Sequence, residues 1–312
     1  MKIDKGDLRR IVALVAVVVL FLGFRYLRYA FSYESTDDAF VTGHIVSVSS
    51  RVDGHVTKVH ISDNQWVNGG DLLVELDPRD FQARLDTELA AVAAAEAAVE
   101  ESRAQINVAA ADANRVQKDV ERYRSLISSG GITQQQMDRT VAESQAASAR
   151  LVAANRQVAV ANARVAEARA TAEQGKLNLS YTKIYAPQSG RVVNKSVEEG
   201  EYIRVGQALM AIVPQDMWVV ANFKETQLKY MQPGQEVKIK IDAYPQKVFK
   251  GHVDSIQAGT GAAFSLLPPE NATGNYVKVV QRVPVKIVFD GDPNETKMLS
   301  PGMSVRPEVK IK

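Results

Sequence analysis

Apolar residues recur with a period of seven through the middle of the chain, from about residue 81 to residue 179. The register holds up to Gly130 and Gly131 and resumes after them. A second row, three residues further along, holds mostly small side chains such as Ala95, Ser102 and Ala161. Large and small residues in alternate core rows are typical of two closely packed, supercoiled helices. The first row consists of Leu85, Val92, Val99, Ile106, Ala113, Val120 and Ile127, then Met137, Ser144, Leu151, Val158, Val165, Ala172 and Leu179.

The two helical arms are expected to fold back on each other as an antiparallel coiled-coil hairpin over residues 78–179, because only a few residues separate them. Each arm of about 45 residues would extend about 70 Å at the usual rise per residue. An alanine-rich disordered spacer is the alternative, but chance seldom keeps one register for so long. Asp77 is a candidate cap of the first helix, with Pro78 at the first helical position.

Near the N-terminus, an uncharged apolar run from Ile11 to Phe24 follows four basic residues. A spanning helix needs about 20 residues, which the run reaches if Arg25 and Arg28 snorkel to the head groups. A cleaved signal peptide is the alternative, although no small-residue cleavage site follows. We expect a cytoplasmic tail at 1–10, a single transmembrane anchor at 11–31, and the bulk of the chain outside the cytoplasm.

Alternation with period two, typical of β-strands, replaces the heptads on both sides of the hairpin, in residues 32–77 and 180–214. Gly54 and Gly70 are sixteen residues apart, and so are Gly190 and Gly206. Aligned on these glycines, the apolar positions of the two segments also match. Unless the match is chance, an internal repeat split by an insertion predicts two halves of one small β domain, brought together by the hairpin.

The last segment, residues 215–312, reads as all-β, with predicted strands at 217–223, 235–241, 248–256 and 276–289. A small closed barrel is expected, because closure leaves few open edges. An apolar loop interrupts this segment between Gly259 and Gly274. Such loops are often binding loops, although this one could also fold onto its own barrel. Its candidate contact residues are Phe264, Ser265, Leu266 and Leu267.

Composition excludes several classes of function. With 38 basic and 36 acidic residues the net charge is +2, which gives no electrostatic case for nucleic acid. The absence of cysteine excludes disulfides and thiol catalysis. The four histidines do not cluster into a metal site, and neither a nucleophile elbow nor a phosphate-binding glycine loop is present. We therefore expect a protein without enzymatic activity, metal or cofactor.

Three blocks of residues, together with the order of the predicted elements, resemble a known family. The blocks are Thr36–Val41, Met217–Gln227 and the segment from Gly259 to Arg282. They are similar to HlyD-type membrane fusion proteins, also called periplasmic adaptor subunits, and most similar to the EmrA-like multidrug-efflux adaptors. The resemblance implies an elongated α+β fold. It comprises an N-terminal transmembrane helix, a split lipoyl-like β domain interrupted by the long hairpin, and a C-terminal small β-barrel.

The resemblance also implies partners. The family would place this chain in a bacterial inner membrane, with most of it in the periplasm, as a homo-oligomer that is expected to be a hexamer. It would join an EmrB-like drug/proton antiporter of the major facilitator class to a TolC-like outer-membrane channel. The loop residues Phe264, Ser265, Leu266 and Leu267 would then contact the transporter or a neighbouring copy. Adaptors that dock such channels carry an Arg, a Leu four residues on, and a Ser seven beyond that. Arg122, Leu126 and Thr133 hold this spacing, with Thr in place of Ser, although ordinary surface and cap roles remain alternatives.

Three other functions stay open at this stage. The same scaffold could serve an ABC-driven type I secretion system, against which the short cytoplasmic tail argues. A biotinyl or lipoyl carrier is a second possibility. However, the resemblance implies no lipoyl group, because the helices are inserted where a carrier domain presents its modified lysine. A purely structural coiled-coil protein is the third.

Overall fold

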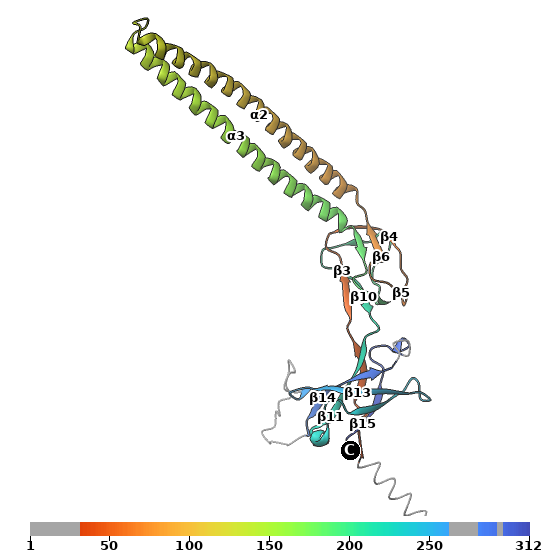
Figure 1. Ribbon diagram of the computed structural model, residues 1–312. Helices are drawn as coiled ribbons and strands as arrows, with labels where there is room; N and C mark the ends of the chain where they lie inside the picture. Colours follow the sequence, from red (N-terminus) through yellow and green to blue (C-terminus); the bar gives the residue numbers. More distant parts are fainter. Residues whose placement is uncertain (1–31, 262–279, 292–295) are drawn as a thin grey trace, which may run out of the picture.

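The computed structural model describes residues 32–261, 280–291 and 296–312, which form three parts along one long axis (Figure 1). A β-barrel lies at one end, a smaller β domain in the middle, and a helical hairpin at the other end. The predicted fold class is confirmed for these three parts. The predicted tail (1–10) and anchor (11–31) lie outside the described residues. No helix in the described part combines the length and the apolarity needed to cross a bilayer.

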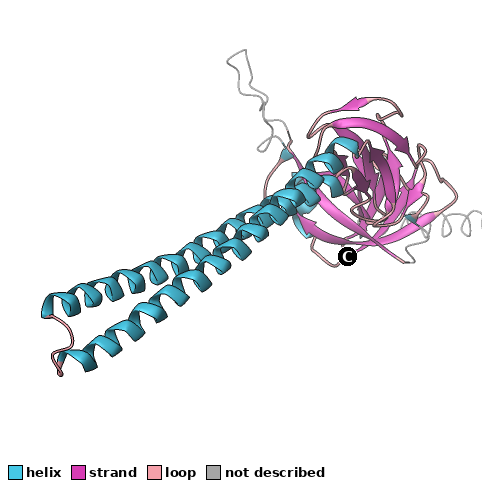
Figure 2. Ribbon diagram, turned by 90° about the horizontal axis from the view of Figure 1, so that it is seen from above, coloured by secondary structure: helices cyan, strands magenta, loops and turns pink. Residues whose placement is uncertain are grey.

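The hairpin consists of α2 (Arg79–Ile127) and α3 (Gln134–Ser180), which run antiparallel along their whole length (Figure 2). Every residue of the predicted large-residue row is buried or half-buried, so the heptad register is confirmed. Polar pairs across the seam fix the same alignment: Arg169 contacts Glu96, and Arg150 lies 3.5 Å from Asp112. Two helices bury only their facing stripes, so apolar residues on their outer sides stay exposed, as Val108 does at 73%.

One layer of the seam near the hairpin root departs from the small-residue rule. Glu88 occupies the row that Ala95 and Ser102 continue, and it faces Gly175 of α3. Its Oε2 atom is buried there with no hydrogen-bond partner among the described residues. A Cβ atom on Gly175 would lie on top of this carboxylate, so the glycine provides the room that the acidic side chain occupies.

The middle domain contains two four-stranded sheets, and each takes strands from both sides of the hairpin. One sheet has the order β3-β10-β8-β5 and the other β7-β6-β4-β9. The upstream strands are β3 (Val46–Ser49), β4 (Gly54–Val59), β5 (Trp66–Val67) and β6 (Leu72–Leu76). The downstream strands are β7 (Lys183–Tyr185), β8 (Gly190–Val193), β9 (Tyr202–Ile203) and β10 (Ala208–Val213). Neither half of the chain therefore contains a complete sheet of its own.

The two halves pair reciprocally. β4 joins β9 with Gly54 opposite Ile203, and β5 joins β8 with Val67 opposite Gly190. The sequence repeat matches Gly54 with Gly190 and Val67 with Ile203, so each pairing is the image of the other. The shared core includes Val67, Leu73, Ile203 and Leu209, each at most 1% exposed. The internal repeat read from the sequence is thus present as a pseudo-twofold domain.

The turns of the two halves follow the same pseudo-twofold symmetry. Gly70 and Gly206 occupy matching positions and adopt φ values of 90° and 80°. Asn64 and Gly200 also match, with φ values of 62° and 85°. Left-handed backbone favours glycine, and asparagine is among the few other residues that adopt it readily. The recurrence of these glycines in the sequence therefore reflects the same turns built twice.

The barrel is one seven-stranded sheet in the order β1-β15-β12-β13-β14-β11-β2. Its strands from the C-terminal segment are β11 (Met217–Lys224), β12 (Glu236–Ile241), β13 (Val248–Ile256), β14 (Arg282–Asp290) and β15 (Val305–Lys310), with a 3-10 helix η1 (Glu225–Tyr230) after β11. The first three predicted strands are confirmed, and the predicted 276–289 strand corresponds to β14 from Arg282 onward. Residues of the predicted strand up to 279 lie outside the described part.

Two barrel strands come from the other end of the chain. β1 (Tyr33–Ser35) pairs with β15, and β2 (Ala39–Gly43) pairs with β11. These two strands are the edges of the sheet, and Val41 closes the barrel by donating its N–H to the Met303 carbonyl at 2.9 Å. The sequence pattern placed these residues with the middle domain. Their short strands could not be assigned to the barrel because their partners lie far away in the chain.

Two glycines with opposite surroundings give a test of the fold. A Cβ on Gly190 would lie 2.6 Å from the Val213 carbonyl oxygen, a backbone atom that cannot move aside. We expect Gly190→Ala to lower the free energy of unfolding by about 1–3 kcal/mol. Gly175→Ala meets only the mobile end of Glu88 and gains about 1 kcal/mol of helix propensity. Urea unfolding followed by circular dichroism measures both; equal midpoints for the two variants would contradict this packing.

The root of α2 supplies a pH-dependent contact. The N-cap residue is Pro78 and not Asp77, so both predicted positions are wrong by one residue. Asp77 lies just before the cap, where its carboxylate accepts the backbone N–H of Arg79 at 3.1 Å. The guanidinium and N–H of Arg79 lower the pKa of Asp77 from 3.8 to about 2. The ionised carboxylate therefore stabilises the folded state above the ordinary pKa, and this contribution is lost as the pH falls from 3.8 to about 2. A carboxyl-carbon NMR titration should place the midpoint near 2, and a midpoint at the ordinary value would contradict the contact.

Candidate functional site: the hairpin tip and the barrel corner

At the hairpin tip, α2 ends in a tight bend built by glycine. The N–H of Gly131 donates to the Leu126 carbonyl at 3.0 Å, and the N–H of Gly130 donates to the Ile127 carbonyl at 3.2 Å. Gly130 has a φ of 71°, in the left-handed region. This hydrogen-bond pattern is the Schellman ending of a helix. The bend holds the end of α2 and the start of α3 at fixed positions on the surface.

Arg122 and Leu126 lie one helical turn apart on the last part of α2. The Arg122 guanidinium lies 3.1 Å from Asp119, and its side chain remains 63% exposed. Leu126 is 38% exposed, although its backbone carbonyl is engaged in the bend. The ion pair orients the guanidinium, and its other donors face solvent. The guanidinium of Arg122 and the apolar side chain of Leu126 are thus exposed next to each other.

Thr133 caps the second helix. It is the N-cap residue of α3, with extended backbone, and its hydroxyl accepts the Gln136 N–H at 3.3 Å. The cap role considered from the sequence is therefore present. The residue is also exposed, across the bend from the end of α2. Arg122, Leu126 and Thr133 are all accessible at the same end of the molecule, which is the condition for acting as one surface.

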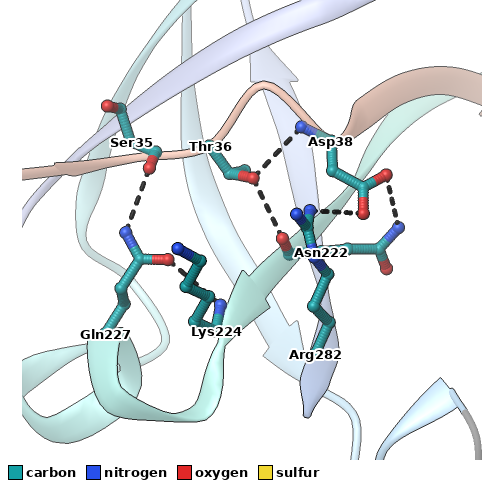
Figure 3. Close-up of polar contacts among 7 residues, drawn as sticks. All are labelled: Ser35, Thr36, Asp38, Asn222, Lys224, Gln227 and Arg282. Atoms are coloured by element: carbon teal, nitrogen blue, oxygen red, sulfur yellow. Dashed lines mark hydrogen bonds and ion pairs between the residues drawn. The ribbon is translucent and has the colours of Figure 1, made fainter. Parts of the chain in front are cut away.

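The other predicted contact residues, Phe264, Ser265, Leu266 and Leu267, lie outside the described residues. The structure instead shows a set of polar residues at the opposite end of the molecule, which we call the barrel corner network (Figure 3). It consists of Ser35, Thr36, Asp38, Asn222, Lys224, Gln227 and Arg282.

The network fixes the turn between β1 and β2. Thr36 is 8% exposed; its hydroxyl donates to the Asn222 carbonyl at 3.0 Å and accepts the Asp38 N–H at 3.1 Å (Figure 3). The Asp38 carboxylate accepts from the Asn222 amide at 3.2 Å and from Arg282 at 2.5 Å. Asp38 and Asn222 also join through their backbones, at 2.8 Å.

Gln227 extends the network to η1. Its side-chain amide donates to the Ser35 carbonyl at 3.1 Å and to the Glu34 carboxylate at 2.8 Å. Its side-chain oxygen accepts the Lys224 N–H at 3.0 Å. The segment that follows the N-terminal 31 residues is therefore tied to three separate barrel elements, so a displacement of that segment would move the barrel with it.

Sequence reasoning used Thr36, Asp38, Asn222 and Gln227 only as markers of the family. The contacts that tie the N-terminal strands to the rest of the barrel join residues far apart in sequence, 184 positions in the case of Asn222 and Asp38. No spacing within one segment could reveal such pairs. The available signal was Asn222, a polar residue inside the otherwise apolar pattern of β11, because such residues often belong to a network that a fold needs.

The histidines make separate contacts and do not gather. His44 packs against Trp218 and His55 against Tyr202, while His60 lies 3.3 Å from Glu75 and His252 lies 2.7 Å from Asp290. Across the residues that the structure describes, no group of three potential ligands could hold a metal ion. The features of the described residues that stand out are the exposed hairpin tip and the barrel corner network.

Comparison with known families identifies the class of protein. Residues 44–215 match the family described as "RND MFP, barrel-sandwich hybrid domain", and residues 216–310 match "AAEA-like beta-barrel domain". These two matches cover the middle domain with its hairpin, and the C-terminal part of the barrel. The chain belongs to the membrane fusion protein family, and the resemblance inferred from its sequence is confirmed.

Individual relatives agree. The chain is 40% identical to "Colistin resistance protein EmrA" of Acinetobacter baumannii, over 95% of this chain and 93% of the relative. It is 36% identical to "Multidrug export protein EmrA" of Haemophilus influenzae, over 99% and 85%. Among solved structures, MacA from Actinobacillus actinomycetemcomitans matches with a TM-score of 0.65 at 22% identity, over 90% of this chain and 81% of that chain. The last likeness concerns the fold alone.

The barrel corner network can be tested by neighbouring carboxylates. Asp38→Asn weakens the ion pair with Arg282, whereas Asp37→Asn removes an equal charge from an exposed side chain with no contact of its own in the described part. We expect Asp38→Asn to cost about 1 kcal/mol, since the pair is partly exposed. Faster amide hydrogen exchange in β1 and β2 should accompany it. Equal exchange rates in both variants would show that the network does not hold the corner.

Proposed function

We propose that this chain is the periplasmic adaptor of a tripartite multidrug efflux pump, anchored in the inner membrane by its N-terminal segment. Its relatives are named for multidrug export and colistin resistance. It would connect an inner-membrane drug/proton antiporter of the major facilitator class to a TolC-like outer-membrane channel. Small toxic compounds would pass along the assembly, with energy supplied by the transporter.

The observation that carries the proposal is the placement of the two ends. The barrel receives the chain from its N-terminal segment, and the hairpin tip lies at the opposite end (Figure 1). The 47 residues of α3 correspond to about 70 Å of helix. A molecule with the barrel next to the predicted anchor at one end, and this long hairpin extending away from it at the other, is suited to bridging two membranes.

Docking at the tip would use Arg122, Leu126 and Thr133. An arginine fork grips carbonyl and carboxylate groups at the end of a partner helix, and a neighbouring leucine adds an apolar contact. Thr133 would contribute its hydroxyl while it also caps α3. The bend keeps the three residues in place before the partner arrives, which lowers the entropic cost of binding.

Assembly as a homo-oligomer, expected to be a hexamer, would cover the outer sides of the hairpin. A lone two-helix hairpin leaves many large apolar side chains in water, which isolated soluble proteins tend to limit. Neighbouring hairpins packed side by side would bury them and form the wall of a conduit. The exposed residues are Leu89, Val108, Val152, Val160 and Leu177.

The docking role is tested by reversing the charge at the tip. We expect Arg122→Asp to reduce drug resistance to the level of a strain without the adaptor, with expression unchanged. Arg115→Asp is the matched control, because Arg115 lies on the same helix and pairs with Asp112 and Asp119. Minimal inhibitory concentrations provide the measurement. Full resistance in the Arg122 variant, or equal loss in both, would refute docking at this position.

Affinity purification of the intact complex tests the partner. A major facilitator transporter should accompany the chain. An ABC exporter would instead indicate a type I secretion adaptor, and the absence of any transporter would favour a purely structural coiled-coil protein.

A further inference from the structure

A cavity lies where the middle domain meets the barrel. Its volume is about 320 Å³, and its walls come from β5, β8, the connection between β10 and β11, and residues 296–301. The size is at the small end of the range for pockets that bind small organic molecules. It belongs neither to the hairpin tip nor to the barrel corner network.

The walls of the cavity expose large apolar side chains. Trp66 is 41% exposed and Ile45 is 60% exposed, and Met217 and Leu299 line the same space. A tryptophan left open beside other apolar groups provides a flat, polarizable surface for an aromatic ring or an alkyl chain. These walls therefore favour a ligand with an apolar body.

The charged side chains among the described residues that line the cavity are both basic. They are Arg191 and Lys297, and within this described lining there is neither an aspartate nor a glutamate. Neither cation forms an ion pair with any described residue, whereas many basic residues on the hairpin do. Arg191 lies directly opposite Trp66 in the pairing of β5 with β8, so the two side chains share one face of the sheet. The cavity thus offers positive charge beside an aromatic surface.

The pseudo-twofold repeat allows Trp66 and Arg191 to be compared with the equivalent residues of the other half. Trp66 and Arg191 correspond to Tyr202 and His55 in the other half, and these also pack together. At that position Asp53 completes the set by accepting the Tyr202 hydroxyl at 2.7 Å. The residue that corresponds to Asp53 in the second half is Ser189, which bears no charge. One half therefore has a carboxylate, Asp53, beside its aromatic residue, whereas the equivalent position of the other half, Ser189, is uncharged.

We propose that this cavity binds an amphipathic organic anion, an aromatic or alkyl carboxylate or sulfonate. Its apolar body would lie against Trp66 and Met217, and its anionic group would be held by Arg191 and Lys297. Because the cavity is formed by two domains, a bound molecule would also hold them at one angle. The inference concerns binding by the purified chain and does not depend on docking to a channel.

The test uses two photoreactive probes of the same shape, 4-benzoylbenzoate and its neutral amide. The full-length chain carries Trp218→Phe, so that Trp66 is its sole tryptophan and its fluorescence reports on the cavity. We expect the benzoate to quench Trp66 in a saturable manner and, on irradiation, to label peptides that contain cavity residues. The amide should bind about tenfold more weakly, since it cannot make the charge-assisted contacts.

Three variants separate specific binding from general adsorption. Arg191→Gln with Lys297→Gln should weaken the benzoate about tenfold and leave the amide unchanged. Ser189→Asp should also weaken the benzoate, because it adds a negative charge two residues before Arg191 at the position that Asp53 holds in the other half. Lys58→Gln, which removes an exposed cation of the same domain away from the cavity, should change nothing. Equal binding of the two probes, or labelling outside the cavity, would overturn the proposal.

Discussion

The reciprocal pairing of strands between the two halves of the middle domain is the constraint on which the rest of the molecule depends. β4 needs β9 and β8 needs β5, so neither half can complete its sheets alone. This pairing brings the two ends of the inserted helices together, where the Leu76 N–H donates to the Thr182 carbonyl at 2.8 Å. The helices must then leave the domain side by side. An antiparallel hairpin follows, and its length sets how far the protein reaches.

The hairpin and the barrel are stabilised in different ways. Two helices have only one seam to bury, so they gain rigidity from an unbroken register and leave their outer surfaces for partners. The barrel buries a true core around Phe223 and Ile239, both fully inaccessible to solvent, and fixes the incoming chain with a polar corner. The middle domain connects these parts and, at its junction with the barrel, leaves a cavity lined by Arg191 and Lys297.

The sequence predicted what repeats locally and missed what depends on distant pairing. The heptads of the hairpin and the matching glycines Gly70 and Gly206 recur at fixed intervals, so their meaning can be read within one segment. The strands around Glu34 and Val41 are short, and their partners lie near the opposite end of the chain. Likewise, the contrast between Asp53 and Ser189 acquires meaning only once the pairing shows that they occupy equivalent places. The tip residues were found through family spacing, and the structure adds that Thr133 also caps a helix.

Barrel closure sets an order of events for the growing polypeptide. β1 lies near the start of the described chain, and it pairs with Val309 and Lys310 of β15, which are synthesised long after it. Contacts so distant in sequence form slowly, and until they form, the edge of β1 is open to pairing with other chains. The hairpin can complete its local contacts much earlier. Loss of the final strand would therefore leave a finished rod on an open sheet, a species prone to aggregation.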